Sequence, residues 1–167
     1  VLLSFCSSKQ VDMLLKLNNK SIIKGLLIEN KLTTLQIDSL INDIEIAVII
    51  AQNIKLTNNQ LNKLLKLNSE EVNKGLCANN KITRKQRDIL FTEFKDNKNN
   101  NMYLTRSYLN SKQIDFYLSK KDFEIWRNIA QYSYKLNYKQ FYTLFSSNDD
   151  DILYYMSIGI KLTQQQA

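Results

Sequence analysis

Apolar residues recur along the chain in short stripes, and a fixed polar phrase precedes every second stripe. The phrase is an apolar residue, then Ser, Thr or Asn, then two variable positions and a glutamine. Its glutamines are Gln10, Gln36, Gln60, Gln86, Gln113, Gln140 and Gln166. They recur every 24 to 27 residues, and a steady period in this range is typical of a stacked repeat protein.

The phrase predicts the start of a helix. Ser, Thr or Asn followed three residues later by Gln is a capping box: the first side chain accepts from a free helix amide, and the Gln bonds back to the amide of the cap residue. In the copy Thr57-x-x-Gln60, Leu56 and Leu61 form a hydrophobic staple around the box. Apolar residues four and five positions after each of the first six glutamines continue the stripe at helical spacing. Every copy therefore predicts an amphipathic helix, and only Arg87 breaks the staple pattern.

A second stripe follows in each unit after a short polar break. It has one apolar residue and then an apolar or small pair four and five positions later, as in Val72 with Leu76-Cys77. This spacing again marks one face of a helix. We therefore predict an all-α fold, an α-solenoid of about six stacked two-helix repeats with a period of about 26 residues. In one domain over 1–167, the repeats are expected at 7–31, 32–55, 56–81, 82–109, 110–135 and 136–161, with 162–167 starting a seventh.

The fourth repeat is irregular. Residues 95–101 contain four asparagines and no apolar side chain. A stretch this polar is not expected to contribute to a packed core, so we predict an exposed loop and a candidate hinge there. The second helix of this repeat is then expected near 102–108.

Composition limits the classes of function. The chain has no Pro, three Gly and no His, and no window holds the roughly 18 apolar residues of a membrane span. The two cysteines, Cys6 and Cys77, are interpreted as small buried hydrophobes, with a lipoprotein signal at 2–6 as the alternative. The run Asp149–Asp151 is interpreted as a solvated loop, with a divalent cation site as the alternative. We predict a cytoplasmic protein that is not an enzyme and that binds no metal or cofactor.

Aromatic residues are concentrated in the second half of the chain. All nine tyrosines lie between Tyr103 and Tyr155, together with the single tryptophan, Trp126. The tyrosines that fall off the apolar stripes are Tyr132, Tyr134, Tyr138, Tyr142 and Tyr154. Larger core side chains in thicker repeats would explain this composition, but exposed Tyr and Trp are also typical of contact surfaces. We therefore predict an aromatic binding surface in this half.

Basic residues form two columns. The chain has 23 Lys and Arg against 16 Asp and Glu, a net charge of +7 that favours anionic partners. The column on the second-helix stripe contains Lys24, Lys74 and Arg127, with Tyr154 in the sixth repeat. The column that precedes the phrase contains Lys31, Lys55, Lys81, Lys135 and Lys161. Equivalent residues of stacked repeats lie about 8 to 10 Å apart, so the first column predicts a basic ladder. The second column complements helix C-termini or contacts anions.

The repeats resemble the short two-helix units of the HEAT-like and leucine-rich-repeat-variant superfamily. An example runs from Leu56-Thr57-x-x-Gln60 through Val72-x-x-x-Leu76-Cys77-x-x-Asn80. The resemblance covers essentially the whole chain and implies a right-handed superhelix whose second helices line the concave side. Members of this superfamily mostly hold other proteins, and one branch of HEAT-like proteins cradles DNA as a glycosylase.

These patterns together predict a non-catalytic scaffold that binds another protein through its inner-helix face and its aromatic half. The predicted partner-binding residues are Lys24, Lys74, Trp126, Arg127, Tyr154 and Tyr155. The alternative is a nucleic-acid-binding repeat protein whose basic columns follow the phosphate backbone. Because each repeat of a stack leaves an apolar face for its neighbour, the C-terminal end is expected to pack on further repeats, a partner or a second copy.

Overall fold

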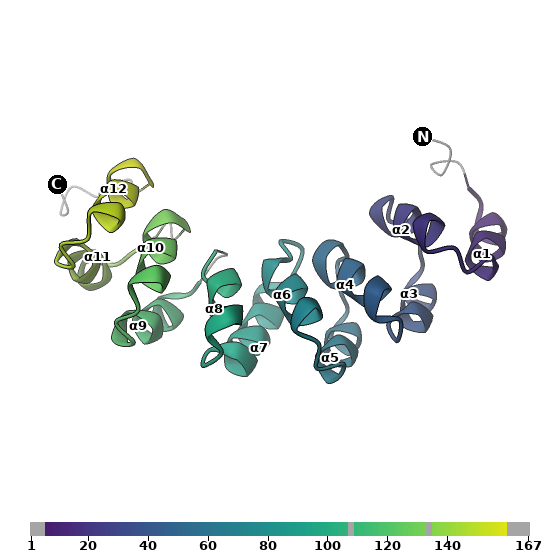
Figure 1. Cartoon of the computed structure of the whole chain (residues 1–167), viewed down its shortest axis with the longest axis horizontal. Helices are drawn as coiled ribbons and strands as arrows, with labels where there is room; N and C mark the ends of the chain where they lie inside the picture. Colours follow the sequence, from purple (N-terminus) through teal and green to yellow (C-terminus); the bar gives the residue numbers. More distant parts are fainter. Residues whose placement is uncertain (1–5, 107–108, 133–134, 160–167) are drawn as a thin grey trace. The chain divides into compact units, whose positions relative to one another are not determined.

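A computed structural model describes residues 6–106, 109–132 and 135–159 of the chain. In these residues there are twelve α-helices and no β-strand, which confirms the predicted all-α class (Figure 1). The helices are α1 (Ser8–Lys16), α2 (Lys20–Ile28), α3 (Thr34–Leu40), α4 (Ile44–Asn53), α5 (Asn58–Lys66), α6 (Glu70–Ala78), α7 (Arg84–Phe94), α8 (Lys98–Leu104), α9 (Ser111–Ser119), α10 (Phe123–Tyr132), α11 (Tyr138–Phe145) and α12 (Asp150–Gly159). Helices this short are stabilised mainly by packing against one another rather than by helix propensity.

The odd-numbered helices begin at the repeated phrase. In α5, the Thr57 hydroxyl accepts a hydrogen bond from the Gln60 amide at 3.2 Å, and the Gln60 side-chain oxygen accepts one from the Thr57 amide at 3.0 Å. The same reciprocal pair of hydrogen bonds opens α1, α3, α7, α9 and α11. The phrase is therefore a capping box in the six copies within the described segments, and the seventh copy, at 162–166, lies outside them.

The glutamine of the phrase also joins consecutive first helices. The side-chain nitrogen of Gln60 donates to the Asp38 carboxylate at 2.9 Å and to the carbonyl of the first residue of α3 at 3.3 Å. Gln140 donates to the Asp115 carboxylate at 2.8 Å and to the carbonyl of the first residue of α9 at 2.9 Å. A glutamate would also complete a capping box, but it has no N–H to donate. The choice of Gln therefore reflects contact with the preceding helix, a role that the capping-box pattern alone did not predict.

The even-numbered helices begin at the polar breaks between the stripes. Their N-cap residues, whose side chains accept from first-turn amides, are Asn19, Asp43, Ser69, Asn97, Asp122 and Asp149. Four of these caps follow a residue with a left-handed backbone, with φ between 47° and 55°, namely Asn18, Asn68, Lys121 and Asn148. Asparagine tolerates this conformation better than most other residues. This explains how a chain with only three glycines closes these turns.

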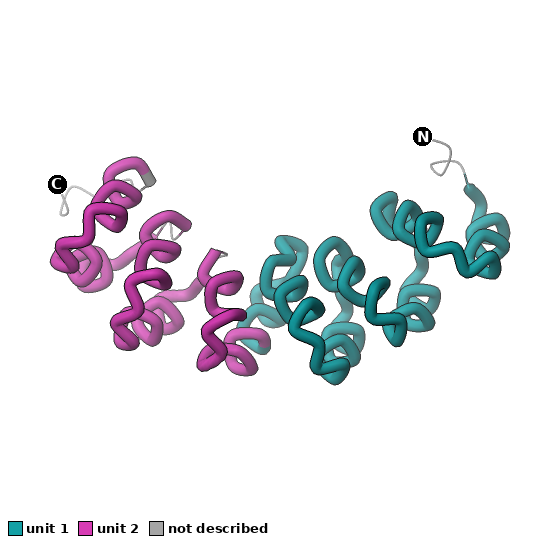
Figure 2. The backbone as a smooth tube through the Cα atoms, viewed as in Figure 1, with its two compact units in different colours: residues 1–89 teal, residues 90–167 magenta. Residues whose placement is uncertain are grey.

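The chain forms two compact units, Val1–Ile89 and Leu90–Ala167, and the division falls inside α7 (Figure 2). In the first unit, α4 packs against both α2 and α6. In the second unit, α10 packs against α8, α9 and α12, and α11 packs against α9 and α12. Second helices of successive pairs therefore pack on one another within each unit.

The asparagine-rich stretch 95–101 is an exposed loop only in part: residues 95–97 form a turn, whereas residues 98–101 belong to α8, so the prediction was wrong for its second half. Asn97 caps α8, which therefore begins earlier in the chain than expected. Asn100 and Asn101 are buried, and the Asn101 side chain accepts a hydrogen bond from the Tyr117 hydroxyl at 2.8 Å. The side-chain nitrogen of Asn101 donates to the backbone carbonyl of Lys95, the residue that follows α7, at 2.8 Å. The buried Asn101 amide is tolerated because it is hydrogen-bonded, whereas the buried side-chain oxygen of Asn100 has no hydrogen-bond partner. Polarity alone therefore did not identify a loop here.

Arg87 breaks the staple pattern because it has another structural role. Its guanidinium is buried and donates to the carbonyl oxygens of Cys77 at 3.1 Å and Asn79 at 2.9 Å, at the end of α6. The positive charge complements the C-terminal end of that helix. Burial lowers the pKa of Arg87 from its ordinary value, although an arginine side chain stays protonated. Cys77 is fully buried, which raises the pKa of its thiol to about 12, whereas Cys6 is half-buried.

Candidate functional site

The predicted basic ladder of the second helices is largely paired with acidic side chains. In the first unit, Lys24 is exposed on α2, while the Lys74 ammonium lies 2.7 Å from the Glu70 carboxylate on the same helix. In the second unit, Arg127 of α10 donates to both carboxylate oxygens of Asp149, at 3.2 and 2.7 Å. These hydrogen bonds raise the pKa of Arg127 and lower that of Asp149. Two of the three cations are thus compensated by carboxylates of their own unit.

The lysines that precede the phrase lie at the ends of second helices. Lys31 is half-buried, and Lys55, Lys81 and Lys135 are exposed. Lys161 lies outside the described part of the chain. These positions are those expected for a positive charge that complements the negative end of a helix.

Trp126 is buried, so the structure does not place it on a contact surface. Its side chain is 7% exposed in the core of the second unit. The equivalent second-helix positions in the first unit are Ile23, Ala47 and Asn73, which are also buried, so repeat register explains the burial. Of the other predicted aromatic anchors, Tyr154 is 61% exposed, and Tyr155 is half-buried against the same core.

Helix α11 carries three exposed aromatic side chains on one face. Tyr138, Tyr142 and Phe145 follow the helical spacing i, i+4, i+7 and are 62%, 58% and 54% exposed. The rings of Tyr138 and Tyr142 stack with centroids 6.3 Å apart and planes 19° apart. We call these three residues the aromatic stripe. From the sequence, Tyr138 and Tyr142 were predicted to lie off the buried face of the helix, but Phe145, five residues after Gln140, was predicted to lie on it.

On α9, the preceding first helix, the residues equivalent to the aromatic stripe face α11. The residues of α9 in the same register are Ser111, Asp115 and Leu118. Ser111 and Asp115 accept hydrogen bonds from Gln140 of α11. Leu118 lines a cavity of about 270 Å³ together with residues of α11. By register, the stripe is therefore the face of α11 that corresponds to a helix junction.

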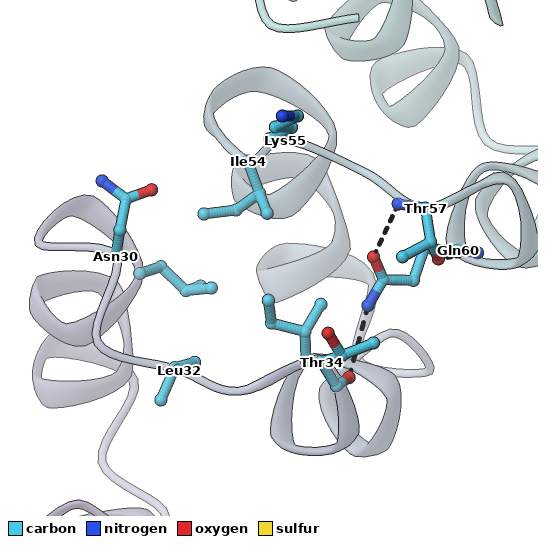
Figure 3. Close-up of a pocket in the computed structure, with 9 residues that line it drawn as sticks. Asn30, Leu32, Thr34, Ile54, Lys55, Thr57 and Gln60 are labelled. Carbon is cyan, nitrogen blue, oxygen red and sulfur yellow. Dashed lines mark hydrogen bonds between the residues drawn. The ribbon is translucent and has the colours of Figure 1, made fainter.

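A second candidate site is a pocket of about 180 Å³ in the first unit, between the ends of α2 and α4 (Figure 3). Its aliphatic lining comes from Leu27, Leu32, Ile37 and Ile54. Asn30 and Lys55 also line it, and the capping box of Thr57 and Gln60 closes one side, where Gln60 reaches the carbonyl of Thr34. An aliphatic lining with a few hydrogen-bonding groups is typical of a site that binds a small molecule or a side chain.

The described residues contain no group of three or more His, Cys, Asp or Glu that could hold a metal ion. Asp149, part of the acidic run considered as a cation site, instead caps α12 and pairs with Arg127. No helix among those residues combines the length and the apolar character that crossing a bilayer requires.

Comparison with known proteins gives no relative. No protein-family model matches the chain, and neither a curated protein nor a solved structure matches it. The functional interpretation therefore depends on the geometry described above.

Proposed function

We propose that this chain is a non-catalytic scaffold, a right-handed α-solenoid of about six HEAT-like two-helix repeats, that binds another protein. The repeated capping boxes support this architecture, as do the glutamine bridges between first helices and the packing of successive second helices within each unit. We place the protein in the cytoplasm, a location compatible with the free thiols of Cys6 and Cys77.

The aromatic stripe of α11 carries the proposal. Three neighbouring aromatic side chains are each more than half exposed, and contiguous exposed apolar surface marks interaction sites. Tyrosine and phenylalanine are enriched at protein interfaces, and the Tyr138 and Tyr142 rings are already stacked. Because tyrosine has few rotatable bonds, binding through these rings loses little side-chain entropy. The matching positions of α9 contact α11, so this helix face is suited by register to packing against another helix.

A protein partner fits the charges better than a nucleic acid does. Lys74 and Arg127 are engaged by carboxylates, and a phosphate backbone would have to displace these acids. The exposed Lys55, Lys81 and Lys135 favour the nucleic-acid alternative. In that case, affinity would fall steeply as salt is raised, because each neutralised phosphate releases counterions.

Photo-crosslinking at the aromatic stripe tests this function. The photoreactive residue p-benzoylphenylalanine replaces Tyr142 or, as a control, Leu35, which is 81% exposed on α3. After irradiation in a lysate of the source organism, we expect a discrete adduct with one protein, identified by mass spectrometry, from position 142 only. Equal adducts from both positions, or none from either, would contradict the proposal. A nuclease-sensitive product would support the nucleic-acid alternative instead.

A further inference from the structure

The glutamine of the first capping box differs from its counterparts in its side-chain nitrogen. Four later glutamines of the phrase donate from this nitrogen to the preceding repeat, namely Gln36, Gln60, Gln86 and Gln140. In Gln10, the side-chain oxygen accepts from the Ser7 amide at 2.8 Å, but the nitrogen has no hydrogen-bond partner among the described residues. The donor that joins one repeat to the repeat before it is therefore available on α1.

Two exposed apolar side chains accompany this glutamine. Met13 on α1 and Leu17 directly after it lie three and seven residues beyond Gln10, and they are 67% and 64% exposed. Residues at this spacing share one side of a helix. In α5, the residue in register with Met13 is Lys63, which donates to Asp38 of α3 at 2.9 Å. This side of a first helix therefore faces the preceding repeat, and we call Gln10, Met13 and Leu17 the α1 face.

The aromatic stripe carries groups that match the α1 face. Tyr142 and Tyr138 lie in register with Asp115 and Ser111 of α9. Gln140 donates to the carboxylate of the former residue at 2.8 Å and to the backbone carbonyl of the latter at 2.9 Å. The Tyr142 hydroxyl and the Tyr138 carbonyl are acceptors of the same kind. The stripe thus offers the two acceptors that a glutamine of the next repeat uses.

The second helices beside these two faces also match. Gly75 lets α6 approach α4 closely, because a Cβ atom at this position would lie 3.0 Å from the Gln52 side chain. Gly25 of α2 occupies the register of Gly75. Ile158 of α12 occupies the register of Gln52 and is 67% exposed. The close contact between α4 and α6 therefore has its counterparts on α12 and α2.

We propose that the α1 face of one copy of this chain binds the aromatic stripe of a second copy, as successive repeats bind one another. The inference names the partner of the stripe and rests on the proposed function. Gln10 of one copy donates to the Tyr142 hydroxyl of the other. Met13 packs on the Tyr142 ring, a favourable contact of sulfur with an aromatic side chain. Because two different surfaces meet, the contact is heterologous, and a dimer keeps one free face of each kind.

Sedimentation-velocity ultracentrifugation of the purified chain tests the proposal with two variants. Met13→Glu with Leu17→Glu removes the α1 face, and Tyr138→Ser, Tyr142→Ser and Phe145→Ser together remove the stripe. All five side chains are exposed, so both variants are expected to fold. We expect the unmodified chain to associate between about 5 and about 500 µM, whereas each variant alone stays monomeric.

Mixing the two variants distinguishes a heterologous contact from any other kind. Each variant retains the face that the other lacks, so the mixture is expected to form a dimer with one copy of each and nothing larger. Leu35→Glu, at an 81% exposed position of α3, is the control and is expected to associate like the unmodified chain. A mixture that stays monomeric, or a variant that associates alone, would overturn the proposal.

Gln10→Glu tests the free donor. Glutamate keeps the acceptor of the capping box but has no N–H, so the variant is expected to associate about three- to tenfold more weakly. An unchanged dissociation constant would overturn the proposal. An unmodified chain that is monomeric at every concentration would also overturn it. The protein-binding function would then still stand if crosslinking from position 142 captures a different protein.

Discussion

Replacing Gln60 by Glu tests the double role of the repeated glutamine. Gln60 is 1% exposed, its oxygen accepts from the Thr57 amide, and its nitrogen donates to the Asp38 carboxylate at 2.9 Å. Gln60→Glu keeps the shape and the capping acceptor but loses the donor and brings a second carboxylate beside Asp38. Gln60→Met is the uncharged control: it loses the same donor and, in addition, the oxygen that accepts from the Thr57 amide.

The magnitude follows from this geometry. Losing a hydrogen bond to a charged group costs roughly 1.5–3 kcal/mol. Two like charges 4 Å apart repel by about 4 kcal/mol at an effective dielectric constant of about 20, and Lys63, whose ammonium lies 2.9 Å from Asp38, offsets part of this repulsion. We expect Gln60→Glu to lower the free energy of unfolding by about 4–5 kcal/mol at pH 7. Gln60→Met, which also loses the capping hydrogen bond, is expected to lower it by about 3 kcal/mol.

Urea unfolding followed by circular dichroism measures both variants at pH 7 and at pH 4. Protonation of one of the two carboxylates removes the repulsion, so the difference between the Glu and Met variants is expected to shrink at pH 4. If Gln60→Glu is as stable as the unmodified chain at pH 7, the glutamine acts only as a helix cap. A difference between Glu and Met that does not change with pH would exclude the proposed carboxylate repulsion.

Three further predictions follow from other features of the fold. Asn79→Ala removes two buried hydrogen bonds and is expected to lower the free energy of unfolding by about 2–3 kcal/mol. The exposed control Asn53→Ala is expected to change it by less than about 0.5 kcal/mol. Equal effects would contradict the role of Asn79 as a buried cap of α4. Lys121→Gly relieves a left-handed backbone and is expected to stabilise the chain by about 0.5–1 kcal/mol in thermal unfolding, and a loss of stability would refute this. Basic side chains hydrogen-bonded to Asp38 and Asp149 lower the pKa of both carboxyls. The stability that these ionised carboxylates contribute is complete above the pKa of the unfolded chain, about 4, and is lost as the pH falls through the lower pKa of the folded chain. A thermal unfolding midpoint that stays constant from pH 5 to pH 2 would contradict this prediction.

Local interactions explain why the helix starts were predictable from the sequence. A capping box involves residues only three positions apart, so Thr57 and Gln60 specify the start of α5 without any information about the rest of the chain. The polar break before each second helix works in the same way, through caps such as Asn19. The strictly repeated Gln, never replaced by Glu, also contained the signal for a donor to the preceding helix.

Tertiary contacts explain the predictions that failed. Asn101 is buried because the hydroxyl of Tyr117, sixteen residues later, donates to it, and no local pattern shows such a partner. Trp126 was assigned to the surface from its residue type, although its repeat register matches the buried Ile23.

The central claim is tested most directly by isothermal titration calorimetry with the partner protein that crosslinking identifies, purified on its own. The comparison is between the unmodified chain and a variant in which Tyr138, Tyr142 and Phe145 are all replaced by Ser. Because these side chains are exposed, the variant is expected to fold, with Leu35→Ser as the matched surface control. We predict at least about 30-fold weaker binding for the triple variant, the loss expected of interface hot spots, and no change for the control. Affinity within about threefold of the unmodified chain would contradict the assignment of the aromatic stripe as the binding surface.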